Sequence, residues 1–439
     1  MSKPKKIDEA WEQLFEQYRI LSHIDNDGVF RITADQINVV HQARLMAKFD
    51  RSALLPEIFR SNQLSILPDT KGTYLIGPFK THEKIEYGIT DPNIAKPSPV
   101  RVKLPTFLKT IDPLDLYSES AILSFAYNSG IIKDIMGDAE DVRFTVNGRM
   151  KSGSFSFFVE NSRQSQNSIA VDVANSQIEI DAGFESPDLF VICEAKQKAP
   201  EELLIRQLYY PYRLWKEKIQ KPVVPVFLTF SGDIFHVFIY EFTDDTIYNS
   251  IKLKEHREYM FAEEDILVQD ILELWKTINT VPEPAVSFPQ ADSFPRILDL
   301  LSELHKGELL RSQVTMMCGF SSRQTNYYIS ACEYLGLVER VSISENQRKY
   351  RLTIEAKAIM TLPHKRKYLE LIRKILERPV FYEAFAAVAN GHGIPSRNEV
   401  CRIMRSVDFP IPMNDTTIGR RSSTVLGWLD WMLRIAVAD

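Results

Sequence analysis

The segment from residue 142 to residue 240 constrains the fold most, because its apolar pattern alternates between the periods of strands and of a helix. Its apolar runs are, in order, VRFTVNG, SGSFSFFVEN, IEIDAGFE, LFVICEAK, the helical IRQLYYPYRLW, VPVFLTF and IFHVFIYEF. Strands that are interrupted by one helix and then continue are typical of a mixed sheet covered by helices. We therefore predict an α/β (α+β) fold centred on a mixed sheet.

The strand pattern LFVICEAK ends in two charged residues. Glu194 and Lys196 lie two positions apart, so their side chains point to the same face of a strand. Placing a carboxylate and an ammonium at the end of an apolar strand costs desolvation free energy unless the two groups are paired or used. This pair therefore indicates a functional site.

A third charged residue, Asp181, lies in the preceding strand pattern IEIDAGFE. If Pro187 and Asp188 form a two-residue hairpin turn, Asp181 lies directly opposite Glu194. Opposed residues have Cβ atoms about 4.5 to 5.5 Å apart, where like charges repel unless a cation lies between them. The pattern thus favours a divalent metal site. Proline suits other turn types better, so a shifted register stays open.

Asp181, twelve intervening residues and then Glu194-Ala195-Lys196 resemble the motif of the PD-(D/E)XK nuclease superfamily, which includes many type II restriction endonucleases. One departure is Ile180, where the family commonly has proline. The resemblance implies that the two acids bind Mg²⁺ and that Lys196 assists the attacking water. Hard oxygen ligands suit Mg²⁺, which polarises a phosphate and acidifies a bound water. A string this short also arises by chance, so an accidental match stays open.

The helical pattern IRQLYYPYRLW offers a further candidate residue. Gln207, near a tyrosine, resembles an accessory motif of related RecB-type nucleases, although the spacing differs. It would hold the attacking water or a DNA phosphate, with Arg206 and Arg213 contacting the DNA backbone. The alternative is a surface glutamine beside packing tyrosines.

Glu119 lies in the first turn of a helix predicted from Ser118, its N-cap, to Met136. The resemblance implies an additional acid from a helix before the sheet, and Glu119 fits that position. The alternative is a favourable interaction with the helix dipole. Glu160 and Glu179 compete for the same role.

Residues 1–110 are less informative. LSILP and GTYLIGPF, joined by DTKG, predict a hairpin. Together with ARLMAKFD and LPEIF, these stretches also resemble parts of predicted type II restriction enzymes. Arg44 and Lys48 are candidate DNA contacts, but a solvated helical face is the interpretation that we favour.

The proline-rich segment 279–293 predicts a linker to a basic C-terminal part. From residue 291 onward the chain holds 21 Lys and Arg against 16 Asp and Glu. Three helical patterns and a hairpin over residues 294–360 resemble a winged helix, whose third helix commonly reads bases. The candidate base-reading residues are Ser322, Arg323, Gln324, Asn326 and Tyr327, and the candidate phosphate contacts are Arg348, Lys349 and Arg351. A winged helix used for dimerisation is the alternative.

Residues 361–439 contain four more helical patterns. The last of them begins with polar and basic residues, including Arg420 and Arg421, and suits a second DNA-reading element. Alternatively, these arginines only stabilise helix ends. The predicted domains are thus 1–110, a nuclease core over 111–278, the linker 279–293, a winged helix over 294–360 and a helical module over 361–439.

Composition excludes several classes of protein. With 44% hydrophobic and 25% charged residues, the chain matches soluble globular proteins. Its apolar stretches are shorter than the roughly 20 residues of a membrane span, and its first residues contain no apolar signal core. Cys193, Cys318, Cys332 and Cys401 are scattered, so neither a disulfide framework nor a zinc site is indicated. We expect a cytoplasmic protein with no membrane partner.

These observations predict a sequence-specific type II restriction endonuclease that hydrolyses phosphodiester bonds of double-stranded DNA with Mg²⁺. A modification-dependent restriction nuclease and a non-catalytic DNA-binding regulator are the alternatives. Cutting both strands favours a homodimer or a transient pair of monomers. A cognate DNA methyltransferase is implied by the family resemblance alone.

Overall fold

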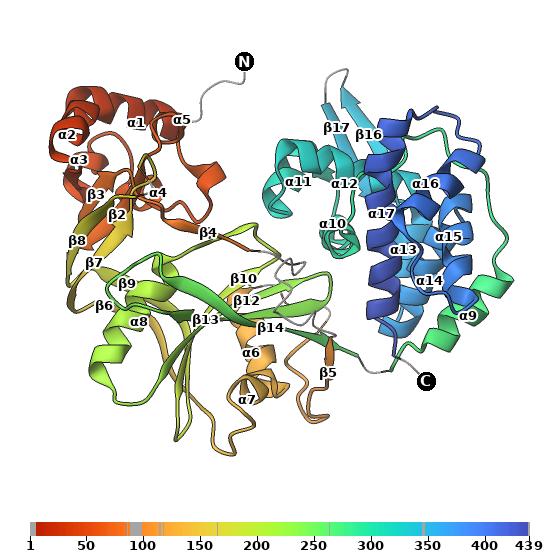
Figure 1. Ribbon diagram of the computed structural model, residues 1–439, viewed down its shortest axis with the longest axis horizontal. Coiled ribbons are helices and arrows are strands. Elements are labelled where there is room, and N and C mark those ends of the chain that lie inside the picture. Colours follow the sequence, from red (N-terminus) through yellow and green to blue (C-terminus); the bar gives the residue numbers. More distant parts are fainter. Residues whose placement is uncertain are drawn as a thin grey trace.

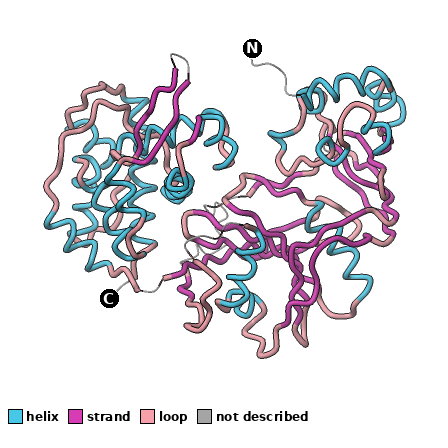
Figure 2. The backbone as a smooth tube through the Cα atoms, turned by 180° about the vertical axis from the view of Figure 1, so that it is seen from behind, coloured by secondary structure: helices cyan, strands magenta, loops and turns pink. Residues whose placement is uncertain are grey.

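The computed structural model describes residues 6–437 except 86, 88–98, 114, 115, 117, 165, 263, 345 and 346. The chain forms an N-terminal lobe, a central sheet and a largely helical C-terminal lobe (Figure 1). Seen from behind, strands run through the centre and helices dominate the C-terminal lobe (Figure 2). The predicted α/β (α+β) class is confirmed. Within the described residues, no helix is long and apolar enough to cross a bilayer.

The central sheet is mixed and has seven strands in the order β5-β14-β13-β12-β10-β9-β6. Their bounds are β5 (Val100–Val102), β6 (Arg143–Lys151), β9 (Gln177–Glu185), β10 (Phe190–Gln197), β12 (Val223–Ser231), β13 (Ile234–Phe242) and β14 (Ile251–Phe261). β10 and β12 are parallel, and the helix α8 (Arg206–Lys218) connects them, because parallel neighbours need a crossover. α8 packs on one face of the sheet, and α6 (Glu119–Asn128) with α7 (Ile131–Ile135) packs on the other.

The hairpin of β9 and β10 has the register that the sequence predicts. Phe190 lies opposite Glu185 and Cys193 lies opposite Ala182. Ser186 closes the two-residue turn, because its backbone N–H donates to the carbonyl oxygen of Leu189 at 3.0 Å. Asp181 and Glu194 therefore follow the last paired residues at the same end of the hairpin.

A second sheet, in the order β1-β3-β2-β8-β7, corrects the prediction that SGSFSFFVEN belongs to the central sheet. Its strands are β1 (Phe30–Thr33), β2 (Ser65–Thr70), β3 (Thr73–Gly77), β7 (Ser154–Glu160) and β8 (Ser168–Ala174). The predicted hairpin of β2 and β3 is confirmed, whereas β8 was not predicted. β7 alternates exposed and buried residues, so only one of its faces needs covering, and it pairs with β8 beside the N-terminal hairpin.

The short elements of the N-terminal lobe surround this second sheet. They are α1 (Lys6–Gln17), α2 (Ile20–Asp27), α3 (Ala34–Asn38), α4 (Ala43–Met46), η1 (Ser52–Leu54) and α5 (Glu57–Ser61). A separate ribbon pairs β4 (His82–Lys84) with β11 (Glu202–Leu204). This ribbon joins the N-terminal lobe to the segment that follows β10.

The helix predicted from Ser118 to Met136 is two helices. Ser118 is the N-cap as predicted, because its hydroxyl accepts from the backbone N–H of Ala121 at 3.1 Å. The helix ends before Gly130, whose φ of 87° lies in the left-handed region, and α7 begins after it. The apolar stripe of the prediction is buried in both helices.

The C-terminal lobe has one continuous apolar core, to which Leu298, Tyr328, Tyr368 and Trp428 all belong. Its elements are α9 (Val268–Thr277), α10 (Phe294–Lys306), β15 (Leu309–Leu310), α11 (Arg311–Met317), α12 (Ser322–Tyr334), β16 (Val338–Ser344), β17 (Gln347–Leu352), α13 (Ile354–Met360), α14 (His364–Leu376), α15 (Pro379–Ala389), α16 (Arg397–Ser406) and α17 (Asp415–Arg434). The predicted linker contacts this core, since the indole N–H of Trp428 donates to the carbonyl oxygen of Ala291 at 2.6 Å.

The turn between β12 and β13 contacts the C-terminal lobe closely. The backbone N–H of Gly232 donates to Asp299 at 2.8 Å. Gly232 has a φ of +58°, and a Cβ there would lie 2.4 Å from the Cβ of Pro295, so only glycine fits. The central sheet and the C-terminal lobe are thus packed against each other.

Candidate active site

Strand ends and helix starts bring the five candidate residues of the sequence to one pocket of about 630 Å³. Asp181 comes from β9, and Glu194 and Lys196 come from β10. Glu119 is the first residue of α6, and Gln207 is the second residue of α8. The pocket is therefore lined by the ends of β9 and β10, by two helix N-termini and by residues of the N-terminal lobe.

Lys196 lies at the centre of a hydrogen-bonded cluster. Its Nζ donates to Oε1 of Glu194 at 2.5 Å and to Oε1 of Glu119 at 3.1 Å. The Nε2 of Gln207 donates to the same Oε1 of Glu194. The backbone N–H of Ala195 donates to Oδ2 of Asp181 at 2.9 Å. Gln207 is thus half-buried and bonded inside the site, which contradicts its alternative interpretation as a surface residue.

Burial and neighbouring charges together shift the pKa values of Glu194 and Lys196. Glu194 is only 5% exposed, and burial, together with the nearby Asp181 carboxylate, raises its pKa to about 8 against the opposing effect of Lys196. Burial alone disfavours the ammonium of Lys196. The carboxylates of Glu194, Glu119 and Asp181 outweigh that effect and raise the pKa of Lys196, which is therefore an ammonium at neutral pH.

The donor set fits a hard divalent cation. The hydrogen bonds of the described residues use Oδ2 of Asp181 and Oε1 of Glu194, so each carboxylate keeps a second oxygen for a ligand. Carboxylate oxygens are the protein ligands that Mg²⁺ prefers. Glu119 is held by Lys196 and, among the described residues, does not form a compact three-acid group with the other two.

The two acids that compete with Glu119, Glu179 and Glu160, lie in different places. Glu179 lines the pocket and pairs with Arg149 at 3.4 Å. Glu160 lies outside the pocket lining and pairs with Lys80 at 2.8 Å.

Arg213, a predicted DNA contact, also lies outside the pocket lining. Its guanidinium donates to the carbonyl oxygen of Asp245 at 2.6 Å.

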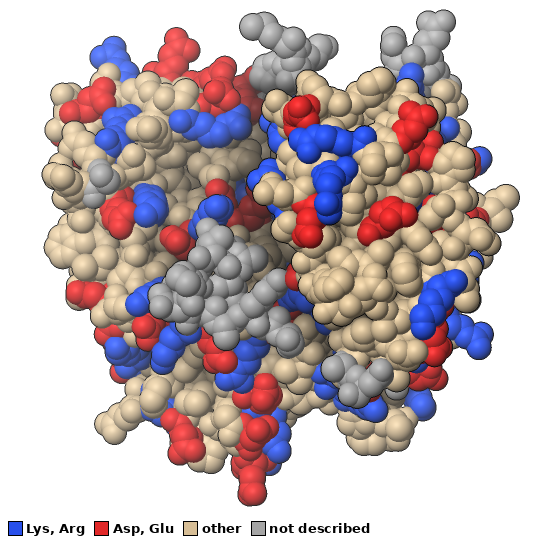
Figure 3. All heavy atoms as spheres, turned by 45° about the vertical axis from the view of Figure 1, so that its right-hand side comes forward, with Lys and Arg blue, Asp and Glu red and all other residues tan. Residues whose placement is uncertain are grey.

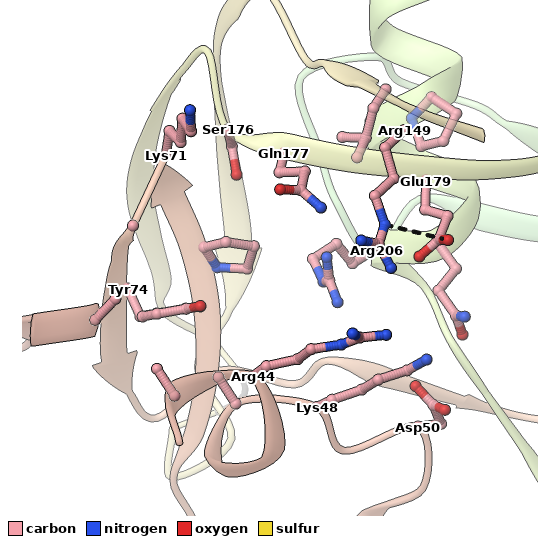
Figure 4. A pocket seen from close by; sticks show the side chains of 18 of the residues that line it. Arg44, Lys48, Asp50, Lys71, Tyr74, Arg149, Ser176, Gln177, Glu179 and Arg206 are labelled. Atoms are coloured by element: carbon pink, nitrogen blue, oxygen red, sulfur yellow. Dashed lines mark ion pairs between the residues drawn. The ribbon is translucent and has the colours of Figure 1, made fainter. Parts of the chain in front are cut away.

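A basic wall faces the acids across the pocket, and in the described chain it comprises Arg44, Lys48 and Lys71 of the N-terminal lobe. Arg149 on β6 and Arg206 on α8 add basic groups on the side of the acids. Figure 4 shows Arg44 and Lys48 extending into the pocket from the N-terminal lobe, with Arg149 and Arg206 opposite them. The side chains of Arg44 and Lys48 are exposed, and the solvent they face is that of the pocket. Arg44 lies on α4, but Lys48 lies beyond its end, so the favoured interpretation as a helical face is wrong for Lys48. Nothing local in ARLMAKFD indicates this placement.

A smaller hollow of about 210 Å³ separates the site from the C-terminal lobe. Lys196 lines it from the sheet, and Met317 lines it from α11. Arg51 of the N-terminal lobe bridges it, because its guanidinium donates to the carbonyl oxygen of Gly319 at 2.9 Å. The space-filling view shows the molecule hollowed between its lobes, with Lys and Arg side chains on the rims (Figure 3).

The candidate base-reading residues begin α12 and lie outside the pocket. Gln324 has both polar atoms engaged: its Oε1 accepts from the backbone N–H of Ser321 at 2.8 Å, and its Nε2 donates to Glu201 at 2.6 Å. Arg323 donates to the hydroxyl of Tyr327 at 2.6 Å. Asn326 accepts from Arg311 at 2.8 Å, and the side chain of Ser322 is exposed.

The remaining candidate DNA contacts also lie away from the pocket. Arg348 is exposed on β17, and Lys349 pairs with Glu308 at 3.7 Å. Arg420 is exposed on α17. Arg421 is half-buried and donates to Gln290 at 2.6 Å, and burial lowers its pKa.

Comparison with known families divides the chain into three parts. Residues 8–76 match the model of a domain of unknown function, DUF6996, and residues 77–260 match a second such domain, DUF6997. Residues 296–437 match a third, DUF7226. No curated protein and no solved structure matches the chain. The chain is therefore similar to three domains whose functions are undefined, and the pocket lies between residues of the first two.

Proposed function

We propose that the chain is a Mg²⁺-dependent endonuclease that cleaves double-stranded DNA at a defined sequence. The observation that carries this proposal is the convergence of Asp181, Glu194 and Lys196 in one pocket beneath a basic wall. The mixed sheet covered by helices is consistent with the resemblance of the motif to the PD-(D/E)XK superfamily. An accidental match of the motif predicts no such convergence.

In this proposal Asp181 and Glu194 would hold Mg²⁺. When bound, Mg²⁺ supplies a Lewis acid for the phosphate and acidifies a water. Lys196, whose pKa the surrounding carboxylates raise, donates hydrogen bonds to the attacking water or to the developing phosphorane charge. Gln207 orients Glu194 by its hydrogen bond to Oε1. Glu119 orients Lys196 from the other side.

The C-terminal lobe supplies the second part of the proposal, sequence recognition. The three helices α10, α11 and α12 and the sheet β15-β17-β16 follow the order of a winged helix. Ser322, Arg323, Asn326 and Tyr327 present polar groups on α12 for base edges. Gln324 has a different role in this arrangement, since it caps α12 and contacts Glu201.

The test is cleavage of unmethylated phage and plasmid DNA by the purified chain in the presence of Mg²⁺. Discrete fragments that disappear with EDTA support the proposal. Cleavage of methylated DNA alone favours the modification-dependent nuclease. A gel shift of DNA that is never cut under either condition overturns the enzymatic part and favours a DNA-binding regulator.

The basic wall leads to a prediction about how the affinity for DNA depends on salt concentration. Replacing Arg44 and Lys48 together with alanine removes two cations from the proposed phosphate path. Each phosphate contact contributes about 0.9 to the slope of log K against log salt, so we expect the slope to fall by about 1.8. Fluorescence anisotropy of a labelled duplex in EDTA, measured over a series of salt concentrations, gives this slope.

Lys254→Ala is the matched control, because Lys254 is an exposed cation on β14 outside the pocket lining. Its slope should equal that of the wild type. If the Arg44→Ala/Lys48→Ala chain has the wild-type slope as well, the basic wall does not contact DNA.

A further inference from the structure

Three buried side chains cluster on the central sheet. They come later in the sequence than the residues of the proposed active site. His236 lies on β13 directly opposite Glu258 on β14. His256 precedes Glu258 by two residues, so the three side chains share one face of the sheet. Their exposed fractions are 6% for His236, 3% for His256 and 1% for Glu258. Water therefore has little access to these polar groups.

The ligand atoms of this cluster have the spacing of a metal site. Nδ1 of His236 lies 3.3 Å from Nε2 of His256 and 3.3 Å from Oε1 of Glu258. Nε2 of His256 lies 4.0 Å from the same oxygen. In a tetrahedral zinc site with bonds of about 2.0 to 2.2 Å, two ligand atoms lie about 3.3 to 3.6 Å apart. The two distances from Nδ1 of His236 match this spacing, and the third, 4.0 Å, is longer. Among the described residues, this is the one group of three such ligands within 4.8 Å of one another.

The cluster also contains polar atoms without hydrogen bonds. In the described part of the chain, Oε1 of Glu258 and Nδ1 of His256 are buried and accept or donate none. Buried polar atoms are nearly always satisfied in folded proteins, so such atoms call for an explanation. Nδ1 of His236 and Nε2 of His256 share a hydrogen bond at 3.3 Å, so the ligand atom of this group that needs a partner is Oε1 of Glu258. A cation between the two imidazoles and the carboxylate supplies one.

A neighbouring helix orients Glu258. Its Oε2 is held by the guanidinium of Arg434 from α17, which leaves Oε1 directed at the histidines.

We propose that His236, His256 and Glu258 form a buried Zn²⁺ site at the junction of the central sheet and the C-terminal lobe. Two imidazoles and one carboxylate are a donor set that zinc accepts. The site stabilises the contact of Glu258 with α17, and it is independent of the proposed nuclease activity. The ligands are drawn from two strands, so no cysteine motif is needed.

The test measures bound zinc in the Asp181→Asn variant. This substitution removes one acid of the nuclease pocket, so zinc bound in that pocket does not add to the measured amount. After dialysis against Zn²⁺ and then against buffer, elemental analysis should find one zinc per chain. Adding His256→Phe should abolish this zinc, because phenylalanine keeps the stacking on Phe238 at 4.3 Å but has no ligand atom. His364→Phe is the matched control, a buried histidine packed against Tyr368 outside the cluster, and should retain zinc.

Two outcomes overturn the proposal: no retained zinc in the Asp181→Asn chain, or full zinc in its His256→Phe derivative. If the His256→Phe chain does not fold, X-ray absorption at the zinc edge of the parent chain gives the answer instead. Two imidazoles and oxygen in the first shell are expected, and sulfur ligands or a shell of oxygen alone contradict the site. DNA cleavage is not part of either readout, so a failure here leaves the proposed function untouched.

Discussion

Replacing Lys196 with methionine is expected to lower the rate of Mg²⁺-dependent DNA cleavage by about 10³-fold or more. Methionine keeps the apolar stem of the side chain but removes the ammonium that contacts Glu194 and Glu119. The proposed transition state then loses a cation that lies beside the two acids. Asp181→Asn should be similarly inactive, because it removes a carboxylate that would hold the metal. Initial rates on a plasmid with a single cut site measure both effects.

Lys221→Met is the matched control for this experiment. Lys221 also pairs with a glutamate of the central sheet, Glu185, at 2.7 Å, but at the opposite end of the β9–β10 hairpin. Its cleavage rate should stay near that of the wild type, and all variants should still shift DNA in a gel. A folded Lys196→Met chain that cuts at the wild-type rate would falsify the proposed site.

The second large effect concerns stability. Asp233→Asn is expected to lower the free energy of unfolding by about 3 kcal/mol, because it leaves the ammonium of Lys367 buried without a counter-charge. The Nζ of Lys367 donates to Asp233 at 2.7 Å, and the side chain of Lys367 is 7% exposed. The hydroxyl of Tyr368 also donates to Asp233, at 2.9 Å. Urea denaturation followed by circular dichroism measures the loss.

Asparagine is the substitution of choice because Asp233 has a φ of 62°, a conformation that asparagine also tolerates. The double variant Asp233→Asn/Lys367→Met should recover most of the lost stability, since replacing both partners of a buried ion pair is often neutral. If the double variant is no more stable than Asp233→Asn, the loss comes from the turn and not from the unpaired charge.

The same ion pair predicts a dependence on pH. Burial disfavours the Asp233 carboxylate, but the ammonium of Lys367 outweighs it and holds the pKa of Asp233 below its ordinary value of 3.8. The stabilisation is therefore present above the unfolded pKa and is lost as the pH falls through the folded pKa. Denaturation curves of the wild type and of Asp233→Asn should begin to converge as the pH falls below about 4. Curves that stay equally separated at pH 7 and at pH 3 contradict this assignment.

The local sequence pattern was sufficient to predict the hairpin that carries the candidate site. The two-residue turn at Pro187 and Asp188 determines the register of β9 and β10, and the alternation of side chains in a strand then places Glu194 and Lys196 on one face. Ser118 as an N-cap and the helices of the C-terminal lobe follow from equally local rules. These features depend on residues only a few positions apart.

Contacts between distant residues were decided by the tertiary structure alone. β8 pairs with β2 of the N-terminal lobe, and β7 pairs with β8, which brings Arg44 and Lys48 across from Asp181. Gln324 reaches Glu201, more than a hundred residues away, so a residue predicted to read bases is engaged in the free protein. His236, His256 and Glu258 meet only when β13 pairs with β14. The physical reason is common to all of them: strand partners and lobe contacts depend on which surfaces bury each other, and periodicity within one segment carries no information about its distant partner.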